Sequence, residues 1–409
     1  MEYYTKAYLI KKMSILSVAL QICGSLAYLL PETENVIGLR EVVSHSDIFS
    51  RQFYSTHGVD VKENFVSSPI GASVALSMLT YGVDENLRKR LERNLLFCRN
   101  RNVQNHGMRA LVNILNFPGD SQMGRLIFVD RRALIMPRFR LAMLRIFQTG
   151  IQTVDYRNPR NAIKTINTWW HRKSKSDSYN IISPGDVSNR TILVIANVVE
   201  FNSHWATTFH KEAKHLHHLY DENGRVRHHR TMYTLQAMEH RAFRSVGILF
   251  IQIPYQEADL SLVLIMSRNA SETTILDHHF NLGLLFNMSR NANVDFNLPK
   301  LRIESTIDLT DFLVRSGIGD GFRSFTRITP RPLKFSSIKQ KTYIEIDETT
   351  TRAISTTIIT NNESKSKKPA APEAPVHFKA EVPFYFAIVK HLNPQDYVVL
   401  FNGHYKNVN

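Results

Sequence analysis

The feature that most constrains this 409-residue chain is a segment near its C-terminus that combines strand chemistry with a polar tip. Residues 345–360 are dense in Thr and Ile, whose branched side chains favour an extended backbone. Residues 361–368 are polar and basic, which suits an exposed tip, and a spacer rich in Pro and Ala follows them. The segment is therefore either a strand end with a long loop or a spare strand without a partner. Proteins normally protect a spare strand, because it can pair with any sheet edge that it meets.

This segment is bordered by Glu345-Ile346-Asp347-Glu348 and Phe378–Phe386, and Val399–Gly403 forms a closing strand near the end of the chain. Together these residues resemble the reactive-loop region of the serpin family. Further family motifs follow in order along residues 45–409, namely Asn64 with Ser68-Pro69, Asn167 with Trp169, the series Asn197, Phe201, Trp205 and Phe209, and Leu298-Pro299-Lys300. The resemblance implies a mixed α/β fold with many helices and three sheets, in which an exposed loop at about residues 348–377 can insert into a large central sheet.

The resemblance also implies roles for individual residues of this loop. If Glu348 begins the hinge, alternate side chains face the core after insertion, and they must be small. Those positions hold Thr351, Ala353, Ser355 and Thr357, so insertion is not sterically forbidden. The whole hinge then comprises Glu348, Thr349, Thr350, Thr351, Arg352, Ala353, Ser355 and Thr357. Counting onward in the family pattern places the scissile bond near Ser364–Lys365, where a lysine would attract a trypsin-like serine protease.

Several positions depart from the family pattern. Thr350 stands where the hinge normally has Gly, and Arg352 stands where it has an acidic residue. In the region where the central sheet opens, which we assign to Ser68, Asn197, Trp205 and Gln340, the glutamine replaces a His, and nearby Gly71 replaces a Ser. Slow insertion would let the protease finish cleavage and leave. Two functions therefore stay open: a serine-protease inhibitor that traps its target by loop insertion, and a non-inhibitory member that carries a ligand or acts as an extracellular signal.

The N-terminus predicts secretion. Residues 1–27 have a basic start, an apolar stretch and small residues before a plausible cleavage site, which leaves a single domain at 28–409. The alternative is a membrane anchor that continues to Leu30, which the polar Gln21 disfavours. Four Asn-x-Ser/Thr sequons are possible glycan sites: Asn189, Asn269, Asn287 and Asn362. Removal of the signal peptide, which contains Cys23, would leave Cys98 without an intrachain partner.

The charge balance favours anionic partners. With 51 Lys and Arg against 36 Asp and Glu, the formal net charge is +15. A basic run could bind a heparin-like polyanion or could simply be a solvated face; it comprises Arg88, Lys89, Arg90, Arg93, Arg99 and Arg101. No aromatic residues interleave with it, so nucleic-acid binding is not expected. No constellation with enzymic spacing is visible, and we expect a monomer without cofactor or catalytic residues.

Local patterns predict the remaining elements. Ser68 and Pro69 suit the start of a helix, and Asn223-Gly224 predicts a hairpin between Lys214–Tyr220 and Arg225–Met232. His215 and His217 would share a face of that hairpin, but surface histidines are the simpler interpretation and we predict no metal site. Other expected helices are Ser46–Ser55 and Ile163–His171, and other expected strands are Leu126–Val129, Gly150–Val154, Thr191–Trp205, Ile251–Tyr255 and Leu260–Ile265.

Overall fold

The computed structural model describes residues 34–98, 100–116, 122–173, 180, 182–200, 203–209, 216–220, 226–243, 248–267, 281–315, 318, 324–330, 333–334, 339–348, 376–379 and 383–406. Its helices are α2 (Glu34–His57), α3 (Pro69–Thr80), α4 (Glu85–Asn94), α5 (Arg101–Leu115), α6 (Pro137–Arg145), α7 (Pro159–Lys173), α8 (Leu282–Met288) and α9 (Leu309–Arg315). Its strands are β1 (Phe65–Ser67), β2 (Gln122–Asp130), β3 (Gly150–Val154), β4 (Leu193–Glu200), β5 (Leu216–Tyr220), β6 (Val226–Phe243), β7 (Ile248–Pro254), β8 (Leu260–Ser267), β9 (Arg290–Pro299), β10 (Leu301–Asp308), β11 (Ser324–Phe325), β12 (Leu333–Lys334), β13 (Lys339–Ile346), β14 (Val376–Lys379), β15 (Phe384–His391) and β16 (Tyr397–Tyr405).

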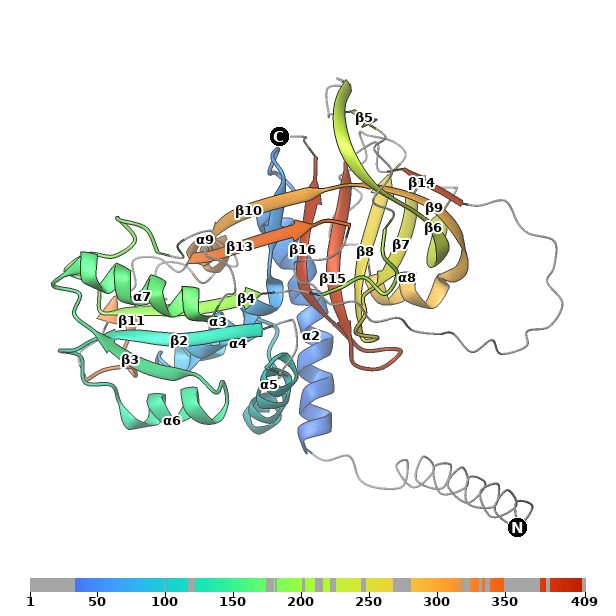
Figure 1. Ribbon diagram of the computed structural model, residues 1–409. Helices are drawn as coiled ribbons and strands as arrows, with labels where there is room; N and C mark the ends of the chain where they lie inside the picture. The colour runs from blue at the N-terminus through green and yellow to red at the C-terminus, as the bar shows by residue number, and fades with distance from the viewer. Residues whose placement is uncertain are drawn as a thin grey trace, which may run out of the picture.

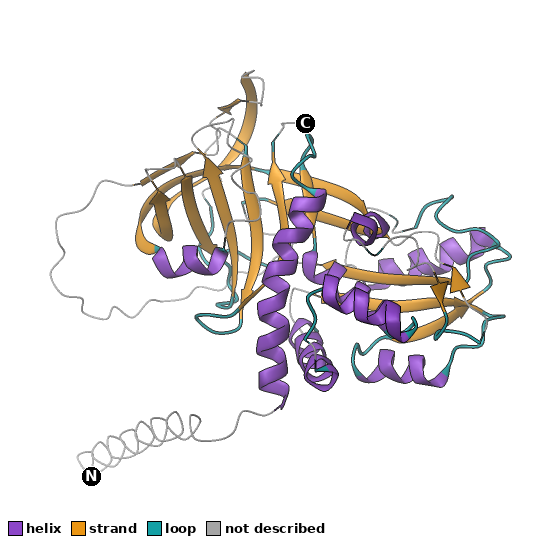
Figure 2. Cartoon of the chain, turned by 180° about the vertical axis from the view of Figure 1, so that it is seen from behind, coloured by secondary structure: helices purple, strands orange, loops and turns teal. Residues whose placement is uncertain are grey.

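The largest sheet has the order β1-β16-β15-β8-β7-β6-β9-β14, and β5 pairs with β6 beside it. Its middle strands are continuous apolar runs because they are covered on both faces, and every residue of β16 is buried. The long helix α2 packs along β16, as Figure 1 and Figure 2 show from opposite sides. The predicted hairpin is confirmed, since Leu216 pairs with Arg230 and Tyr220 with Val226.

Two smaller ladders lie on the other side of the molecule (Figure 1). One has the order β3-β2-β4, and the other is the antiparallel pair β10-β13. Helix α7 packs on β2, where Trp169 makes an edge contact with Phe128 at 5.6 Å between ring centroids. The side-chain amide of Asn167 holds the chain that follows this helix. It accepts a hydrogen bond from the N–H of Ile182 and donates one to the carbonyl of Ile182.

Helices α2 and α5 approach unusually closely because glycines face each other. A Cβ atom on Gly107 would lie 1.9 Å from the carbonyl oxygen of Gly38, so no larger residue fits there without movement. Helix α2 extends well beyond the expected Ser46–Ser55, from Glu34 to His57. The sequence pattern missed its first turns because packing against α5 supplies stability that local periodicity does not reveal.

Helix α3 begins as the sequence predicts. The side chain of Ser68 accepts a hydrogen bond from the N–H of Gly71, and Pro69 occupies the first turn. Every residue of α3 is buried, which explains why the helix is apolar all round rather than striped. The expected strand Thr191–Trp205 is shorter, since β4 ends at Glu200 and Trp205 instead forms an isolated bridge with Tyr255.

Candidate loop-insertion site

The gap between β4 and β13 is the structural feature that matters most for loop insertion. β13 pairs with β10 from Leu301↔Ile346 to Asp308↔Lys339, and β4 pairs with β2. β4 and β13 contact each other, but no hydrogen-bonded ladder joins them along the described residues of either strand. Each strand therefore presents one edge to the other, and an edge is where a further strand can be added.

One end of the gap is closed by Gln340 on β13. Its side-chain oxygen accepts from the N–H of Ser68 at 3.1 Å, and its nitrogen donates to the carbonyl of Ser68 at 2.8 Å. Both residues are buried, at 6% and 2% exposure. The predicted sheet-opening residues Ser68 and Gln340 are thus brought together. The glutamine satisfies the buried N–H of Ser68 and adds a second donor to its carbonyl, which also accepts from the N–H of Ala72.

A second layer of hydrogen bonds fixes the serine side of this clamp. The hydroxyl of Ser68 donates to the carbonyl of Leu400 at 2.7 Å, and that of Ser67 donates to the amide oxygen of Asn402 at 2.5 Å. Asn402 in turn reaches the hydroxyl of Ser50 on α2. The polar network therefore connects the gap to the core strand β16 and to the longest described helix.

The other end of the gap is held by Trp205. Its indole N–H donates to the carbonyl of Asp347 at 2.9 Å, and its ring stacks on Tyr255 at 4.6 Å between centroids. Asp347 is the residue after β13 ends, so the tryptophan holds the chain at the point where the hinge begins. Burial raises the pKa of the Tyr255 hydroxyl well above its usual range, so this ring stays neutral.

The first residue of the predicted hinge forms an ion pair. The carboxylate of Glu348 lies 2.6 Å from the ammonium group of Lys300, which follows β9 in the Leu-Pro-Lys motif. A shallow hollow lies beside these anchors; its lining includes Ser203, Trp205, Tyr255, Tyr343, Asp347 and Phe401. The sequence contains both partners of the ion pair, but no local signal connects them because they pair only in the folded chain.

The rest of the predicted loop lies outside the described residues. This applies to Thr349, Thr350, Thr351, Arg352, Ala353, Ser355, Thr357 and the proposed scissile pair Ser364 and Lys365. Asn197 lies on β4 opposite Arg125 of β2. The roles proposed for these residues stay predictions.

Two of the four predicted glycan sites are in described segments, and both are exposed. Asn189 lies in the loop before β4, and Asn287 lies on α8. Exposure is necessary for glycosylation but does not establish it, so the glycans stay predictions. Asn269 and Asn362 lie outside the described residues.

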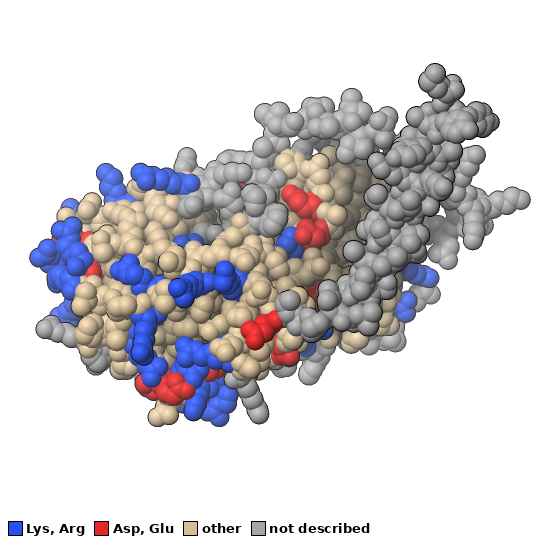
Figure 3. Space-filling view, turned by 90° about the horizontal axis from the view of Figure 1, so that it is seen from below, with Lys and Arg blue, Asp and Glu red and all other residues tan. Residues whose placement is uncertain are grey.

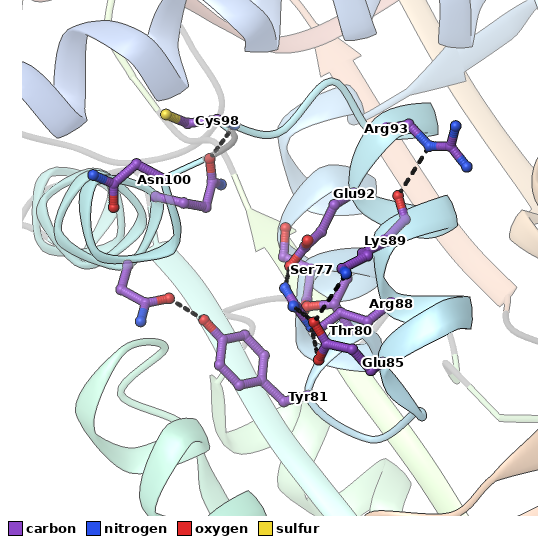
Figure 4. A network of polar contacts seen from close by, with 12 residues as sticks. Ser77, Thr80, Tyr81, Glu85, Arg88, Lys89, Glu92, Arg93, Cys98 and Asn100 are labelled. Atoms are coloured by element: carbon purple, nitrogen blue, oxygen red, sulfur yellow. Dashed lines mark hydrogen bonds and ion pairs between the residues drawn. The ribbon is translucent and has the colours of Figure 1, made fainter.

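The basic run is not one uniform surface. Arg88 is buried and forms ion pairs with Glu85 and Glu92, which is the network at the centre of Figure 4. Arg101 packs over the ring of Tyr81 at 5.0 Å. The exposed charges of the run are therefore carried by the other described members Lys89, Arg90, Arg93 and Arg101, while Arg99 lies outside the described residues. Polyanion binding stays a prediction, without a direct role for Arg88.

Three further features of the described ranges bear on the sequence predictions. Within them, no group of three or more His, Cys, Asp or Glu side chains could hold a metal ion. No helix among the described segments is long and apolar enough to cross a membrane. The thiol of Cys98 is free and half-buried.

Comparison with known families gives a match over most of the chain. The family model described as "Serpin (serine protease inhibitor)" matches residues 44–408. An uncharacterized serpin-like protein of Methanosarcina mazei is 24% identical over 370 residues, which cover 85% of this chain and 84% of that protein. Human Serpin B3 is 23% identical, covering 73% of this chain and 84% of the relative.

Solved structures agree in fold. Serpin48 of the insect Tenebrio molitor matches with a TM-score of 0.77 at 21% identity, covering 90% of this chain and 99% of that one. Human thyroxine-binding globulin, solved in complex with thyroxine, matches with a TM-score of 0.75 at 20% identity, covering 90% of this chain and 99% of that one. Native protease nexin-1 with heparin matches with a TM-score of 0.76 at 22% identity, covering 92% of this chain and 100% of that one. At these identities the likeness shows the fold alone, and the predicted mixed α/β architecture is confirmed.

Proposed function

Since this chain belongs to the serpin family, we propose that it is a secreted inhibitor of serine proteases that traps its target by inserting the cleaved loop between β4 and β13. The observation that carries the proposal is the gap itself, where two strand edges lie side by side without a ladder. The predicted hinge would start at that gap, which is supported by the contacts of Trp205 with Asp347 and of Lys300 with Glu348.

Insertion would release free energy by completing the sheet. No ladder joins the described residues of β4 to those of β13, and each hydrogen bond that an inserted strand adds would contribute about 1 kcal/mol in net terms. The protease would be bound through an ester between its serine and the carbonyl carbon on the N-terminal side of the cleaved bond. Movement of the hinge would carry the ester across the molecule before water hydrolyses it, so trapping depends on the relative rates of insertion and hydrolysis.

The test is to mix the purified protein with trypsin and search for a complex that survives denaturing electrophoresis. Ser355→Arg places a long charged side chain at an inward-facing hinge position, and it should abolish the complex while cleavage continues. Ile354→Arg is the matched control, since its side chain would face outward and the complex should persist. The proposal of inhibition of trypsin-like enzymes would be refuted if the unaltered protein were completely cleaved while trypsin stayed fully active at every molar ratio of protein to trypsin tested.

A second function, a non-inhibitory ligand carrier or extracellular signal, is favoured by the clamp at Gln340. The glutamine binds both backbone groups of Ser68, and together with Thr350 and Arg352 it would slow opening and insertion. Thyroxine-binding globulin shares the fold and is solved in complex with thyroxine. Thermal unfolding before and after trypsin nicking separates the two functions: a large rise in melting temperature supports insertion, and no rise supports the carrier.

Two finer parts of the proposal need their own measurements. Secretion predicts that protein recovered from the medium begins near residue 28 and loses mass on glycosidase treatment, which N-terminal sequencing and mass spectrometry would check.

Binding of a heparin-like polyanion predicts that the protein is retained on a heparin column. Lys89→Gln combined with Arg93→Gln should weaken that retention. Because protease nexin-1 has been solved with heparin, its fold is compatible with that ligand.

A further inference from the structure

Helix α6 lies at the edge of the molecule (Figure 1), and it exposes leucines to solvent. Leu141 and Leu144 are exposed to 45% and 62%, and Leu134 just before the helix is exposed to 74%. The opposite side of the helix carries Phe139 and Met143, which are buried in the main core. The exposed leucines are therefore surplus to folding. We call Leu134, Leu141 and Leu144 with the adjoining Arg138, Arg140 and Arg145 the α6 surface.

The α6 surface has an apolar centre and a basic border. With about 3.6 residues per turn, Leu141 lies directly opposite the buried Phe139 and Met143, and Leu144 lies next to it, about 60° around the helix axis. Arg140 lies beyond Leu144, and Arg145 and Arg138 lie beyond Leu141, so arginines flank the two leucines on both sides. This arrangement differs from an ordinary solvated helix, in which the charged residues occupy the middle of the outer face.

The charge of this region is of one sign. Residues 131–145 contain five Arg and no Asp or Glu. Arg131 and Arg132 are partly neutralised by Asp155 and Asp130. For Arg138, Arg140 and Arg145, the described part of the chain provides no carboxylate within ion-pair distance. Figure 3, which views the molecule from the side of α6, shows Lys and Arg prevailing over Asp and Glu across the left half of this face.

We propose that the α6 surface docks on a membrane that contains anionic phospholipid. The border of arginines would lie at the level of the phosphate groups, and the leucines would enter the boundary between headgroups and acyl chains. A sulfated polysaccharide would use the arginines but would gain nothing from the leucines. A convex helix with apolar residues at its apex needs no matching groove in a fluid bilayer, whereas a folded protein partner would need one.

The test measures binding of the purified protein to vesicles by co-sedimentation. Vesicles of phosphatidylcholine with about a third phosphatidylserine should bind it, and vesicles of phosphatidylcholine alone should bind it much more weakly. Leu141→Ser combined with Leu144→Ser should weaken binding at least about tenfold. Arg138→Gln, Arg140→Gln and Arg145→Gln together should remove the preference for anionic vesicles and the sensitivity of binding to salt.

Leu235→Ser combined with Leu284→Ser is the matched control, because these leucines are exposed to 51% and 60% on β6 and α8. The control and the α6 variant have the same N-terminal residues, so a difference in vesicle binding between the two variants is due to α6 and not to the N-terminus. All the changed side chains are exposed, and unchanged melting temperatures would verify folding. The proposal would be overturned if the protein did not bind vesicles, or if both leucine variants lost binding equally. It would also be overturned if the protein bound heparin alone and the leucine substitutions left that binding unchanged.

Discussion

The two sheet systems of this molecule are held together in opposite ways. In the large sheet, β15 and β16 pair along their whole lengths, and their side chains are almost entirely apolar and buried. In the smaller ladders, β4 and β13 stay unpaired with each other, and a few polar contacts hold the ends of the gap. The first system resists change because apolar burial is spread over many residues, whereas the second can change because its closure depends on single side chains.

The largest effect is expected in the core of the large sheet. Phe386→Ala removes a fully buried ring between β8 and β16 and should reduce the free energy of unfolding by about 3–5 kcal/mol. Urea denaturation of the intact protein measures it. Val314→Ala on α9, where the side chain is 42% exposed, should change stability by less than about 0.5 kcal/mol. Similar losses in both variants would contradict the view that this sheet carries the stability.

Acid should weaken the large sheet through His404. Burial, with a smaller contribution from Lys406, lowers the pKa of this histidine from 6.5 to about 4. Between these two values the unfolded chain binds a proton that the folded chain does not, so the free energy of unfolding falls as the pH falls from about 6.5 to about 4. The total loss should be about 3 kcal/mol.

Urea denaturation at a series of pH values measures this loss, and His404→Gln should flatten the curve in that window. The control is His377→Gln, whose side chain is 67% exposed. A curve of unchanged slope in the His404 variant would assign the acid sensitivity to other groups. The hydroxyl of Tyr54 and the carbonyl of Glu63, which contact the two ring nitrogens, would then merely orient a non-titrating ring.

A smaller effect is expected at the clamp of the gap. Gln340→Ala would leave the N–H of Ser68 buried without this partner, at a cost of about 1–3 kcal/mol, while the carbonyl keeps the N–H of Ala72. It should also speed insertion of a synthetic peptide that copies residues 348–360, because one closure of the gap is lost. Lys341→Ala on the same strand is the control, since its ammonium group contacts an exposed carbonyl at Asn180. Equal insertion rates for both variants would show that Gln340 does not restrain the gap.

The smallest effect is expected at the hinge ion pair. Lys300 and Glu348 have side chains exposed to 38% and 20%, so solvent screens the pair and Glu348→Gln should cost at most about 1 kcal/mol. The loss should shrink at high salt. Exchanging the two charges, Lys300→Glu with Glu348→Lys, should recover much of the stability that either single change removes. A double-mutant cycle on melting temperature measures the coupling, and additive losses would indicate that no pair forms in solution.

Much of the architecture followed from local chemistry and motif order. Ser68 with Pro69 correctly predicted the start of α3, and Asn223-Gly224 correctly predicted the pairing of β5 with β6. The boundaries that failed are those set by packing. Helix α2 is longer than its periodicity suggests because it lies against α5, and β4 ends before Trp205 because the chain there turns to contact Tyr255.

The sequence by itself determined which residue types were available at the candidate site, since the motif order along the chain identifies Ser68, Gln340 and Trp205 as candidate residues. Only the tertiary structure decided how they act. Gln340 pairs with a residue 272 positions away, and Trp205 with one 142 positions away. Local propensity reaches only a few residues along the chain, whereas these bonds form after the core has brought distant strands together. The same reason explains why Lys300 as the partner of Glu348, and the outward leucines of α6, became visible only in the folded molecule.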